Sequence, residues 1–297
     1  MLSAEPLHVL QGNEDEVYSV SIGYHDTLVA VGAADGLIRV YDPSTGEQTR
    51  LRTAHRRNPV FGLEFYADSP LLFSAGQDAV RLGYVVGESP VPSIPNKHTR
   101  GVLCTAARSG VRHFASGAFD GKIIIWDVLS GTDIHHIDAH QKATSRLAFN
   151  RDGTVLLSCG YDGRICGWDP FSGKQIFEFQ AHQGECYAVE FTPDESAFIS
   201  AGQDNLVMVW NASTREGTKI GKTEGPPSRA RIHPDGNQIG VPCGDGTVAT
   251  FSLANPGEPV QTQKAHDGVA YDMAYSRDGK FAVTGGADKL AKIWQIV

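Results

Sequence analysis

The feature that most constrains this chain of 297 residues is an aspartate that recurs every 41 to 43 positions. The seven copies are Asp35, Asp78, Asp120, Asp162, Asp204, Asp245 and Asp288. An aromatic residue stands six positions after each copy: Tyr41, Tyr84, Trp126, Trp168, Trp210, Phe251 and Trp294. Four positions before it is a site that we call the hydroxyl position, occupied by Ser74, Ser116, Ser158, Ser200 and Thr284 in five units and by Val31 and Val241 in the other two. A repeat of this length indicates copies of one supersecondary unit that stack on their neighbours.

Each unit is predicted to be a small antiparallel sheet. In the most complete copy, residues 140–169, short apolar runs lie around 147–149, 155–157 and 165–168. Runs this short, bounded by Asp-Gly, predict strands joined by tight hairpins, because glycine tolerates the positive φ of such turns. An alternating run at 174–179 supplies a further strand. The sequence therefore predicts an all-β chain with about four strands in each unit.

A histidine accompanies the hydroxyl residue in five units. His98, His140, His182 and His266 stand eighteen residues before it, and His55 stands nineteen before Ser74. Units one and six lack both the histidine and the hydroxyl. Paired loss is what a buried hydrogen-bond network predicts, because one orphaned polar group costs about 1–3 kcal/mol whereas replacing both partners is nearly neutral.

The repeat resembles the WD-repeat family of β-propellers. The Trp-Asp pairs at 126–127 and 168–169, and Ala-His pairs at 54–55, 139–140, 181–182 and 265–266, carry the resemblance, which extends over nearly all of the chain. It implies one domain, residues 1–297, folded as a seven-bladed propeller of four-stranded antiparallel blades around a central channel. It also implies that five tetrads tie strands together within their blades: His55, Ser74, Asp78 and Tyr84; His98, Ser116, Asp120 and Trp126; His140, Ser158, Asp162 and Trp168; His182, Ser200, Asp204 and Trp210; and His266, Thr284, Asp288 and Trp294.

The two ends of the sequence predict how the ring closes. The apolar segment 7–10 precedes the first unit, and the last unit stops at Val297, directly after its third strand. We expect segment 7–10 to pair with the strand around 291–296 and complete the last blade. That pairing removes two exposed sheet edges.

Two units depart from the pattern. In unit two, Pro90, Pro92 and Pro95 fall within 87–97, where a fourth strand is expected, and proline cannot donate to a sheet ladder. In unit six, Gly225-Pro226-Pro227 is a second irregular place. Each is interpreted either as a permissive surface segment or as a groove for a partner.

The residue pattern argues against an enzyme. Histidine, serine and aspartate can form a hydrolytic triad, but this set recurs in five units and an active site needs only one. The sequence contains no Gly-x-Ser-x-Gly elbow and no phosphate-binding glycine loop. His135 and His136 are adjacent, so in a strand they point to opposite faces and do not form a metal site. We therefore expect no catalytic residue, cofactor, metal or small-molecule substrate.

Composition limits the partners and the compartment. A net charge of −8 gives no long-range attraction to nucleic acid or to anionic membranes. The sequence has no apolar run long enough for a membrane span and no secretory signal pattern. Five cysteines without a CxxC pair fit a reducing compartment and are expected to be small buried strand residues. The expected location is the cytoplasm, with the nucleus or a cilium as alternatives.

The resemblance also implies where partners bind. Family members commonly use the rim formed by the loops before the first strand and between the second and third strands of each blade. Two kinds of position matter on this rim: about five residues after the histidine position, and immediately before the turn aspartate. Six aromatic residues occupy them in this chain: Tyr18, Phe61, Phe119, Tyr161, Tyr187 and Tyr271. They are predicted to anchor a partner, the alternative being that the rings pack sideways against neighbouring blades.

The function expected from these observations is a non-catalytic protein–protein interaction scaffold, a subunit of a multiprotein complex that binds peptides or helices of other proteins. The first alternative is a recognition module for modified peptides such as phosphodegrons or histone tails, which would need arginine or acidic residues at the channel mouth. A propeller enzyme is the more distant alternative. The fold alone does not choose the partner or the pathway.

Overall fold

The computed structural model describes residues 1–55, 57–66, 69–84, 94–107 and 112–297, without the side chain of Tyr84. These residues form 27 strands and, within the described ranges, no helix. The strands of the first half are β1 His8–Leu10, β2 Val17–Gly23, β3 Leu28–Ala33, β4 Leu37–Tyr41, β5 Gln48–Thr53, β6 Val60–Phe65, β7 Leu71–Gly76, β8 Val80–Tyr84, β9 Val102–Ala107, β10 His113–Ala118, β11 Lys122–Asp127, β12 Asp133–Asp138 and β13 Thr144–Phe149. Those of the second half are β14 Leu156–Gly160, β15 Arg164–Trp168, β16 Gln175–Gln180, β17 Cys186–Phe191, β18 Ala197–Gly202, β19 Leu206–Asn211, β20 Gly217–Lys222, β21 Arg231–Ile232, β22 Gln238–Pro242, β23 Thr247–Ser252, β24 Gln261–Lys264, β25 Ala270–Tyr275, β26 Phe281–Gly286 and β27 Ala291–Gln295.

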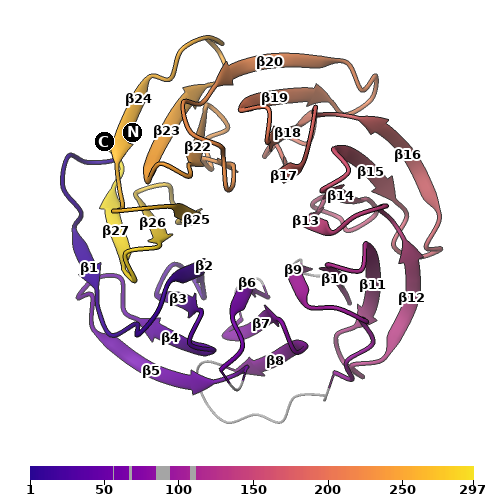
Figure 1. Ribbon diagram of the computed structural model, residues 1–297, viewed down its shortest axis with the longest axis horizontal. Helices are drawn as coiled ribbons and strands as arrows, with labels where there is room; N and C mark the ends of the chain where they lie inside the picture. The colour runs from indigo at the N-terminus through magenta and orange to yellow at the C-terminus, as the bar shows by residue number, and fades with distance from the viewer. Residues whose placement is uncertain (56, 67–68, 85–93, 108–111) are drawn as a thin grey trace.

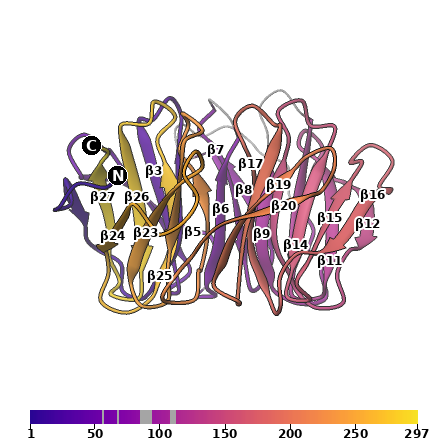
Figure 2. The ribbon, with the colours of Figure 1, turned by 90° about the horizontal axis from the view of Figure 1, so that it is seen from above.

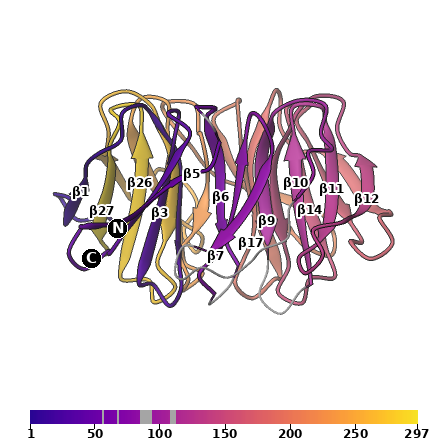
Figure 3. The same cartoon turned by 90° about the horizontal axis from the view of Figure 1, so that it is seen from below.

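Seven antiparallel sheets stand in a ring around a central axis (Figure 1), and the side views show a disc with loops at both faces (Figures 2 and 3). The predicted all-β, seven-bladed propeller is confirmed. Within a blade the strands follow chain order from the channel outward, as in β17-β18-β19-β20. The described part of the second blade has three strands, β6-β7-β8. Most of the predicted irregular segment 87–97 lies outside the described residues, and the described positions 94–97 are not in a strand.

Burial changes from the middle of each blade to its outer edge. The second strand of a blade is buried along all or nearly all of its length, as in β7 and β18, whereas the outermost strand β5 is exposed along its whole length. Six of the seven tight turns between second and third strands contain a residue with positive φ, and the turn of the second blade, with Ala79, is the exception. Gly163 has φ 79°, and a Cβ there would lie 2.4 Å from the carbonyl oxygen of Gly184. Asn205 and Lys289 take the same place in the fifth and seventh blades, with φ 64° and 67°.

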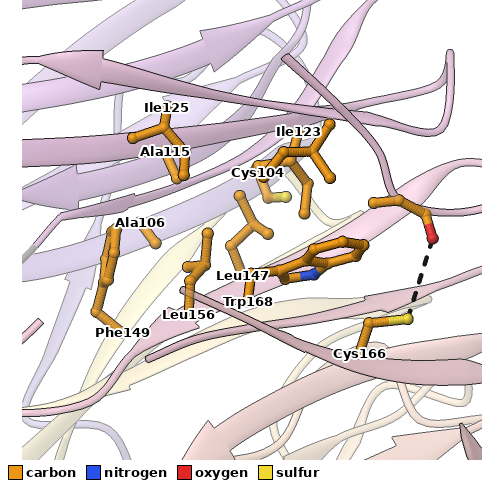
Figure 4. Packing of buried hydrophobic residues seen from close by; sticks show 12 residues of the cluster. Cys104, Ala106, Ala115, Ile123, Ile125, Leu147, Phe149, Leu156, Cys166 and Trp168 are labelled. Carbon is orange, nitrogen blue, oxygen red and sulfur yellow. Dashed lines mark hydrogen bonds between the residues drawn. The ribbon is translucent and has the colours of Figure 1, made fainter. Parts of the chain in front are cut away.

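Neighbouring blades pack face to face. Between the third and fourth blades, Trp168 lies beside Leu147, Cys104 and Ile123 in one buried cluster (Figure 4). Equivalent clusters occur around the ring, so each blade buries its apolar faces only against its neighbours. This nearest-neighbour burial is the main stabilising contribution in repeat proteins.

The ring is joined by a strand from the other end of the chain. β1 pairs with β27 in antiparallel register, His8 opposite Ile293 and Leu10 opposite Ala291, and the last sheet has the order β1-β27-β26-β25. Figure 1 shows β1 outermost on this blade, next to β27. Leu10 is buried in the cluster that joins the last blade to the first.

The residues before β1 add a contact that the sequence analysis did not predict. Leu2 forms a bridge with Ile296 and is buried beside Trp294. Its backbone nitrogen donates to Gln261 Oε1, and its carbonyl accepts from Gln261 Nε2, both at 2.8 Å. The segment therefore ties the seventh blade to the outer strand β24 of the sixth.

The sixth blade carries the second predicted irregularity. Its inner strand β21 has only two residues, and Pro227 forms an isolated bridge with Cys243. The cysteine prediction holds with one difference. All five cysteines are free and buried, but Cys243 follows β22 directly instead of lying within it.

Candidate partner-binding rim

The loops of an up-and-down sheet alternate between its two ends, so each blade contributes two loops to each face of the disc. We call the upper rim the face formed by the loops before each first strand and between second and third strands, such as 181–185 and 203–205. The lower rim is formed by the other loops, such as 192–196 and 212–216.

A β-bulge fixes the first kind of rim position. The register between first and second strands shifts at Tyr18, Phe61, Tyr187 and Tyr271, each of which has no direct cross-strand partner. The same shift leaves Leu103 and Ser145 unpaired in the third and fourth blades. A bulge releases one residue from the ladder and re-aims its side chain. The repeat therefore presents one side chain per bulge next to the upper rim.

Four of the six predicted aromatic residues form a continuous arc. The ring centroids of Tyr271 and Tyr18 are 4.8 Å apart, those of Tyr18 and Phe61 5.7 Å, and those of Phe61 and Phe119 6.1 Å. These residues come from four successive blades, the seventh, first, second and third. All four are partly exposed. We call this set the aromatic arc.

The other two predicted residues form a separate pair. Tyr161 and Tyr187 meet edge to face with centroids 5.8 Å apart. The pair and the arc are not joined by a ring contact among the described residues. The sixth blade interrupts the series, with Gly244 packed against Pro226 at this level. The structure thus shows both the partial exposure expected of binding residues and the packing between neighbouring blades that was the alternative.

Two glutamates hold the tyrosine hydroxyls. Tyr271 Oη donates to Glu16 Oε2 at 2.8 Å, and Tyr187 Oη donates to Glu185 Oε2 at 2.9 Å. Burial and the bond to Glu185 raise the pKa of Tyr187, and burial and Glu16 raise the pKa of Tyr18 to about 12. These hydroxyls therefore remain protonated donors at neutral pH. Sequence reasoning missed both glutamates, although each stands two residues before a bulge tyrosine, a spacing that the repeat offers directly.

A hollow of about 480 Å³ opens beside the arc. Phe61 and Phe119 form its apolar part, and Gln77, Asn96 and Arg100 contribute polar side chains. The Arg100 guanidinium lies 5.7 Å from the Phe119 ring centroid, and its Nη1 donates to the Phe119 carbonyl at 3.3 Å. A cation on the face of an aromatic ring holds both groups in place. The hollow therefore combines an apolar wall with a positively charged edge.

The residues predicted to form tetrads lie directly below the upper rim. In the fifth blade, His182 Nδ1 is 2.9 Å from Asp204 Oδ1 and His182 Nε2 is 2.7 Å from Ser200 Oγ, which accepts from Trp210 Nε1 at 2.8 Å. The blades with His98, His140 and His266 have the same three contacts. In the second blade His55 contacts Asp78 at 2.6 Å and Ser74 at 2.8 Å, and the side chain of Tyr84 lies outside the described part.

The tetrad aspartates connect two upper-rim loops. Asp162 accepts from the backbone nitrogen of Gln141 in the loop before β13 and from that of Arg164 after the turn. Burial alone would raise the pKa of Asp162, but the bonds from His140 and these amides lower it to about 2. Because Tyr161 immediately precedes this aspartate, the network also fixes the backbone of a rim residue.

The tetrad hydroxyls of the fourth and fifth blades are closed to a substrate. Ser200 and Ser158 have no exposed surface, and their hydroxyls are already engaged by histidine and tryptophan. Burial also lowers the pKa of His182 in spite of Asp204, so the imidazole is neutral at pH 7. No group of three or more metal-ligating side chains lies together within the described ranges. The same ranges contain no helix long and apolar enough to span a membrane.

The first blade replaces its missing histidine in a way that sequence reasoning did not foresee. Arg39, which is 3% exposed, places Nη1 2.9 Å from Asp35 Oδ2. Asp35 also accepts from the backbone nitrogen of Leu37 and so keeps its turn. In the sixth blade Asp245 makes the equivalent turn contact with Thr247. The arginine four residues after Asp35 was the available signal.

The family model described as WD domain, G-beta repeat matches residues 4–42, 90–127, 131–169, 173–211 and 257–295, which is more than half of the chain. The chain belongs to the WD-repeat family. The model does not match 43–89 and 212–256, which contain most of the second and sixth WD-repeat blades, the two with irregular segments.

Three relatives illustrate the similarity, and all of them are distant in sequence. The chain is 27% identical over 164 residues to the angio-associated migratory cell protein of Homo sapiens, covering 52% of this chain and 35% of that one. It is 26% identical over 160 residues to pre-mRNA-processing factor 19 homolog 2 of Arabidopsis thaliana, covering 52% and 30%. A match to the serine-threonine kinase receptor-associated protein of Gallus gallus is 22% identical over 285 residues and covers 96% of this chain and 68% of that one. The chain therefore spans about a third of the first two relatives.

Proposed function

We propose that this WD-repeat chain is a non-catalytic scaffold subunit of a multiprotein complex and that it binds a peptide or helix of another protein on its upper rim. The observation that carries the proposal is the aromatic arc, in which partly exposed rings from four neighbouring blades touch one another beside a hollow. Rigid aromatic side chains contribute large contact areas at low entropic cost and dominate interface energetics.

The chemistry of the rim describes the partner. The arc and the pair Tyr161–Tyr187 offer apolar surface, whereas Arg100 at the hollow can contact an acidic side chain. A short segment with one apolar anchor and one neighbouring acidic residue fits this combination. The overall charge of −8 favours protein over nucleic acid as the partner.

The names of the relatives support a role within assemblies. They include a pre-mRNA-processing factor, a U3 snoRNP-associated protein-like protein of Oryza sativa and a kinase receptor-associated protein. We place this chain in the cytoplasm, with the nucleus or a cilium as the alternatives.

The test compares partners captured by matched variants. The tagged protein and its Tyr18→Ala/Phe61→Ala variant, which removes two rings of the aromatic arc, would each be used as bait, and the bound proteins quantified by mass spectrometry. The proteins captured by the wild type should be depleted several-fold, with the bait's Tm unchanged within a few degrees. Arg100→Ala should weaken the same capture if the hollow takes part.

The control removes exposed apolar surface from the opposite face. Leu129 and Phe171, 72% and 58% exposed, lie in lower-rim loops of the third and fourth blades. Leu129→Ala/Phe171→Ala should leave the captured set unchanged. If instead the lower-rim variant loses the partners and the upper-rim variant keeps them, the assignment of the face is wrong.

A further inference from the structure

The channel lining carries a cluster of charged residues apart from the upper rim. Every member stands twelve or ten residues before the hydroxyl position of its unit, on or next to an inner strand. The members are Arg146, Arg229 and Asp272 at the first position and Glu64, Glu190 and Arg231 at the second. The remaining residues at these two positions are small, such as Gly62, Ala106 and Ala148. We call these six residues the channel cluster.

Two spaces that share lining residues adjoin the cluster. A cavity of about 150 Å³ is lined by Arg146, Arg229 and Arg231 together with Glu64 and Glu190. A wider space of about 690 Å³ is lined by the last three of these and by lower-rim loop residues that include Pro193 and Pro234. The shared lining places the wider space next to the cavity, on the side of the lower-rim loops, and we call it the lower mouth.

Asp272 and Glu190 each contact one nitrogen of an arginine. Arg229 Nε lies 3.2 Å from Asp272 Oδ1, and Arg231 Nη1 lies 3.5 Å from Glu190 Oε2. Arg231 Nε also donates to the Met273 carbonyl at 3.1 Å. Two guanidinium nitrogens at the cavity, Arg229 Nη1 and Arg146 Nε, are buried and have no hydrogen-bond partner among the described residues.

An unsatisfied guanidinium in such a place is unfavourable. The Arg229 side chain is 4% exposed, and a guanidinium cannot become neutral by losing its proton in a protein. Asp272 cannot turn toward Arg229 Nη1 without loss, because its oxygens accept from the backbone nitrogens of Val20 at 3.1 Å and Met273 at 2.9 Å. A buried donor without an acceptor is therefore left facing a space that an anion can enter.

The carboxylates are themselves poorly stabilised as anions. Burial raises the pKa of Glu190 above its usual value although Arg231 opposes the change. Burial likewise raises the pKa of Asp272 in spite of Arg231 and Arg146. These acids are weaker competitors for the arginines than exposed carboxylates would be.

We propose that the cavity binds a tetrahedral oxyanion of the phosphate class, which enters by the lower mouth and accepts hydrogen bonds from Arg146, Arg229 and Arg231. A single water needs only roughly 10–15 Å³ of such space, so the cavity has room for a polyatomic ion. Guanidinium groups suit this ligand because their planar N–H groups match adjacent oxygens of a phosphate. The site is distinct from the upper rim and does not depend on the proposed partner.

The experiment measures binding of inorganic phosphate to the whole protein by equilibrium dialysis with radiolabelled phosphate at constant ionic strength. The wild type should bind one ion per chain. Arg146→Gln should weaken binding by about tenfold or more, the loss expected for one charge-assisted hydrogen bond. This variant should fold, because the buried Arg146 Nε has no hydrogen-bond partner among the described residues that the substitution would remove. Glu190→Gln should strengthen binding, since it releases Arg231 from its carboxylate.

Charge-matched controls separate a site from general electrostatics. Arg50 on the exposed strand β5 and the exposed Glu47 lie far from the channel. Arg50→Gln and Glu47→Gln change the net charge as the two channel variants do and should leave phosphate binding unchanged. No saturable binding by the wild type, or equal effects of Arg50→Gln and Arg146→Gln, would overturn the proposal.

Competition with glycerol 3-phosphate identifies the source of the anion. If glycerol 3-phosphate displaces the radiolabelled phosphate more effectively than unlabelled phosphate does, the natural ligand is a phosphoryl group on a larger molecule. If it displaces the label less effectively, the natural ligand is the free ion.

Discussion

The serine hydroxyl is the residue on which each complete tetrad depends. Ser200 Oγ is bonded at once to His182 Nε2 and Trp210 Nε1, at 2.7 and 2.8 Å, and has no exposed surface. Removing it leaves two buried ring nitrogens without a partner. The natural pattern agrees, because the blade with Val241 at the hydroxyl position also lacks the histidine.

Ser200→Ala should therefore lower the free energy of unfolding by about 1–3 kcal/mol. Urea denaturation followed by tryptophan fluorescence would measure it. Ser213→Ala is the control, since Ser213 is exposed and only its backbone nitrogen takes part in a hydrogen bond with the described residues. It should change stability by less than about 0.5 kcal/mol. Equal effects of the two substitutions would show that the tetrad does not stabilise the blade.

The titration of the tetrads predicts the pH dependence of stability. Burial lowers the pKa of His55, His98, His182 and His266 below the usual value of about 6.5 despite the neighbouring aspartates. Just below that pH the unfolded chain binds more protons than the folded one, so stability falls on acidification. Asp162, with a pKa of about 2, adds a loss between roughly pH 4 and pH 2.

We expect Tm to fall progressively from pH 7 to pH 5 and again below pH 4, as calorimetry across this range would show. His182→Gln should make the fall between pH 6.5 and 5 shallower, because one depressed pKa is removed. His136→Gln, at an exposed position on β12, should not. A Tm that rises on acidification to pH 5 would contradict the lowered pKa of the tetrad histidines.

At the scale of elements, β1 joins the two ends of the chain. Its neighbouring side chains differ in exposure, with Leu10 fully buried and Val9 42% exposed. Leu10→Ala should destabilise the protein by about 2–5 kcal/mol because it removes buried apolar contact between the last and first blades. Val9→Ala should have a small effect on the same strand.

Deleting residues 1–11 should lower Tm more than Leu10→Ala does. The deletion removes the β1–β27 pairing, the buried Leu2 and its two bonds to Gln261. Differential scanning fluorimetry of the three proteins would give this order. A Tm of the deleted protein close to that of the wild type would mean that the strand does not hold the ring together.

The elements that follow the repeat could be predicted from the sequence, whereas the contacts outside the repeat could not. The spacing of the turn aspartates located the blades, and the unpaired third strand at the end of the chain located the partner of segment 7–10. Leu2 was missed because one apolar residue before a proline has no period to identify it. Arg39 was missed because a substitute partner for Asp35 is required only in the blade where the histidine is absent.

The positions of the six aromatic residues in the repeat were predictable from the sequence, but the contacts among their rings were not. The repeat located six aromatic residues, but only the three-dimensional structure shows that four form an arc and that the other two form a separate pair. The channel cluster could have been found from the same repeat spacing, because its members occupy only two positions of the repeat. It was overlooked because charged residues on different blades become neighbours only when the ring closes.

For the whole molecule, the ring predicts how substitutions combine. Each blade contacts its two neighbours, and Figure 1 shows β14 and β26 on opposite sides of the channel. Ser158 on β14 and Thr284 on β26 each complete a separate tetrad. Ser158→Ala and Thr284→Val should therefore add in their effects on the free energy of unfolding, within about 0.5 kcal/mol, because they share no partner.

Two substitutions inside one tetrad should behave differently. His140→Ala and Ser158→Ala remove the same 2.8 Å hydrogen bond, so the double variant should lose less than the sum of the single losses. Urea titration of the five proteins, each compared with the wild type, would distinguish the two cases. A strong interaction between the distant pair would mean that the closed ring transmits strain between opposite blades, and the nearest-neighbour description of its stability would then be wrong.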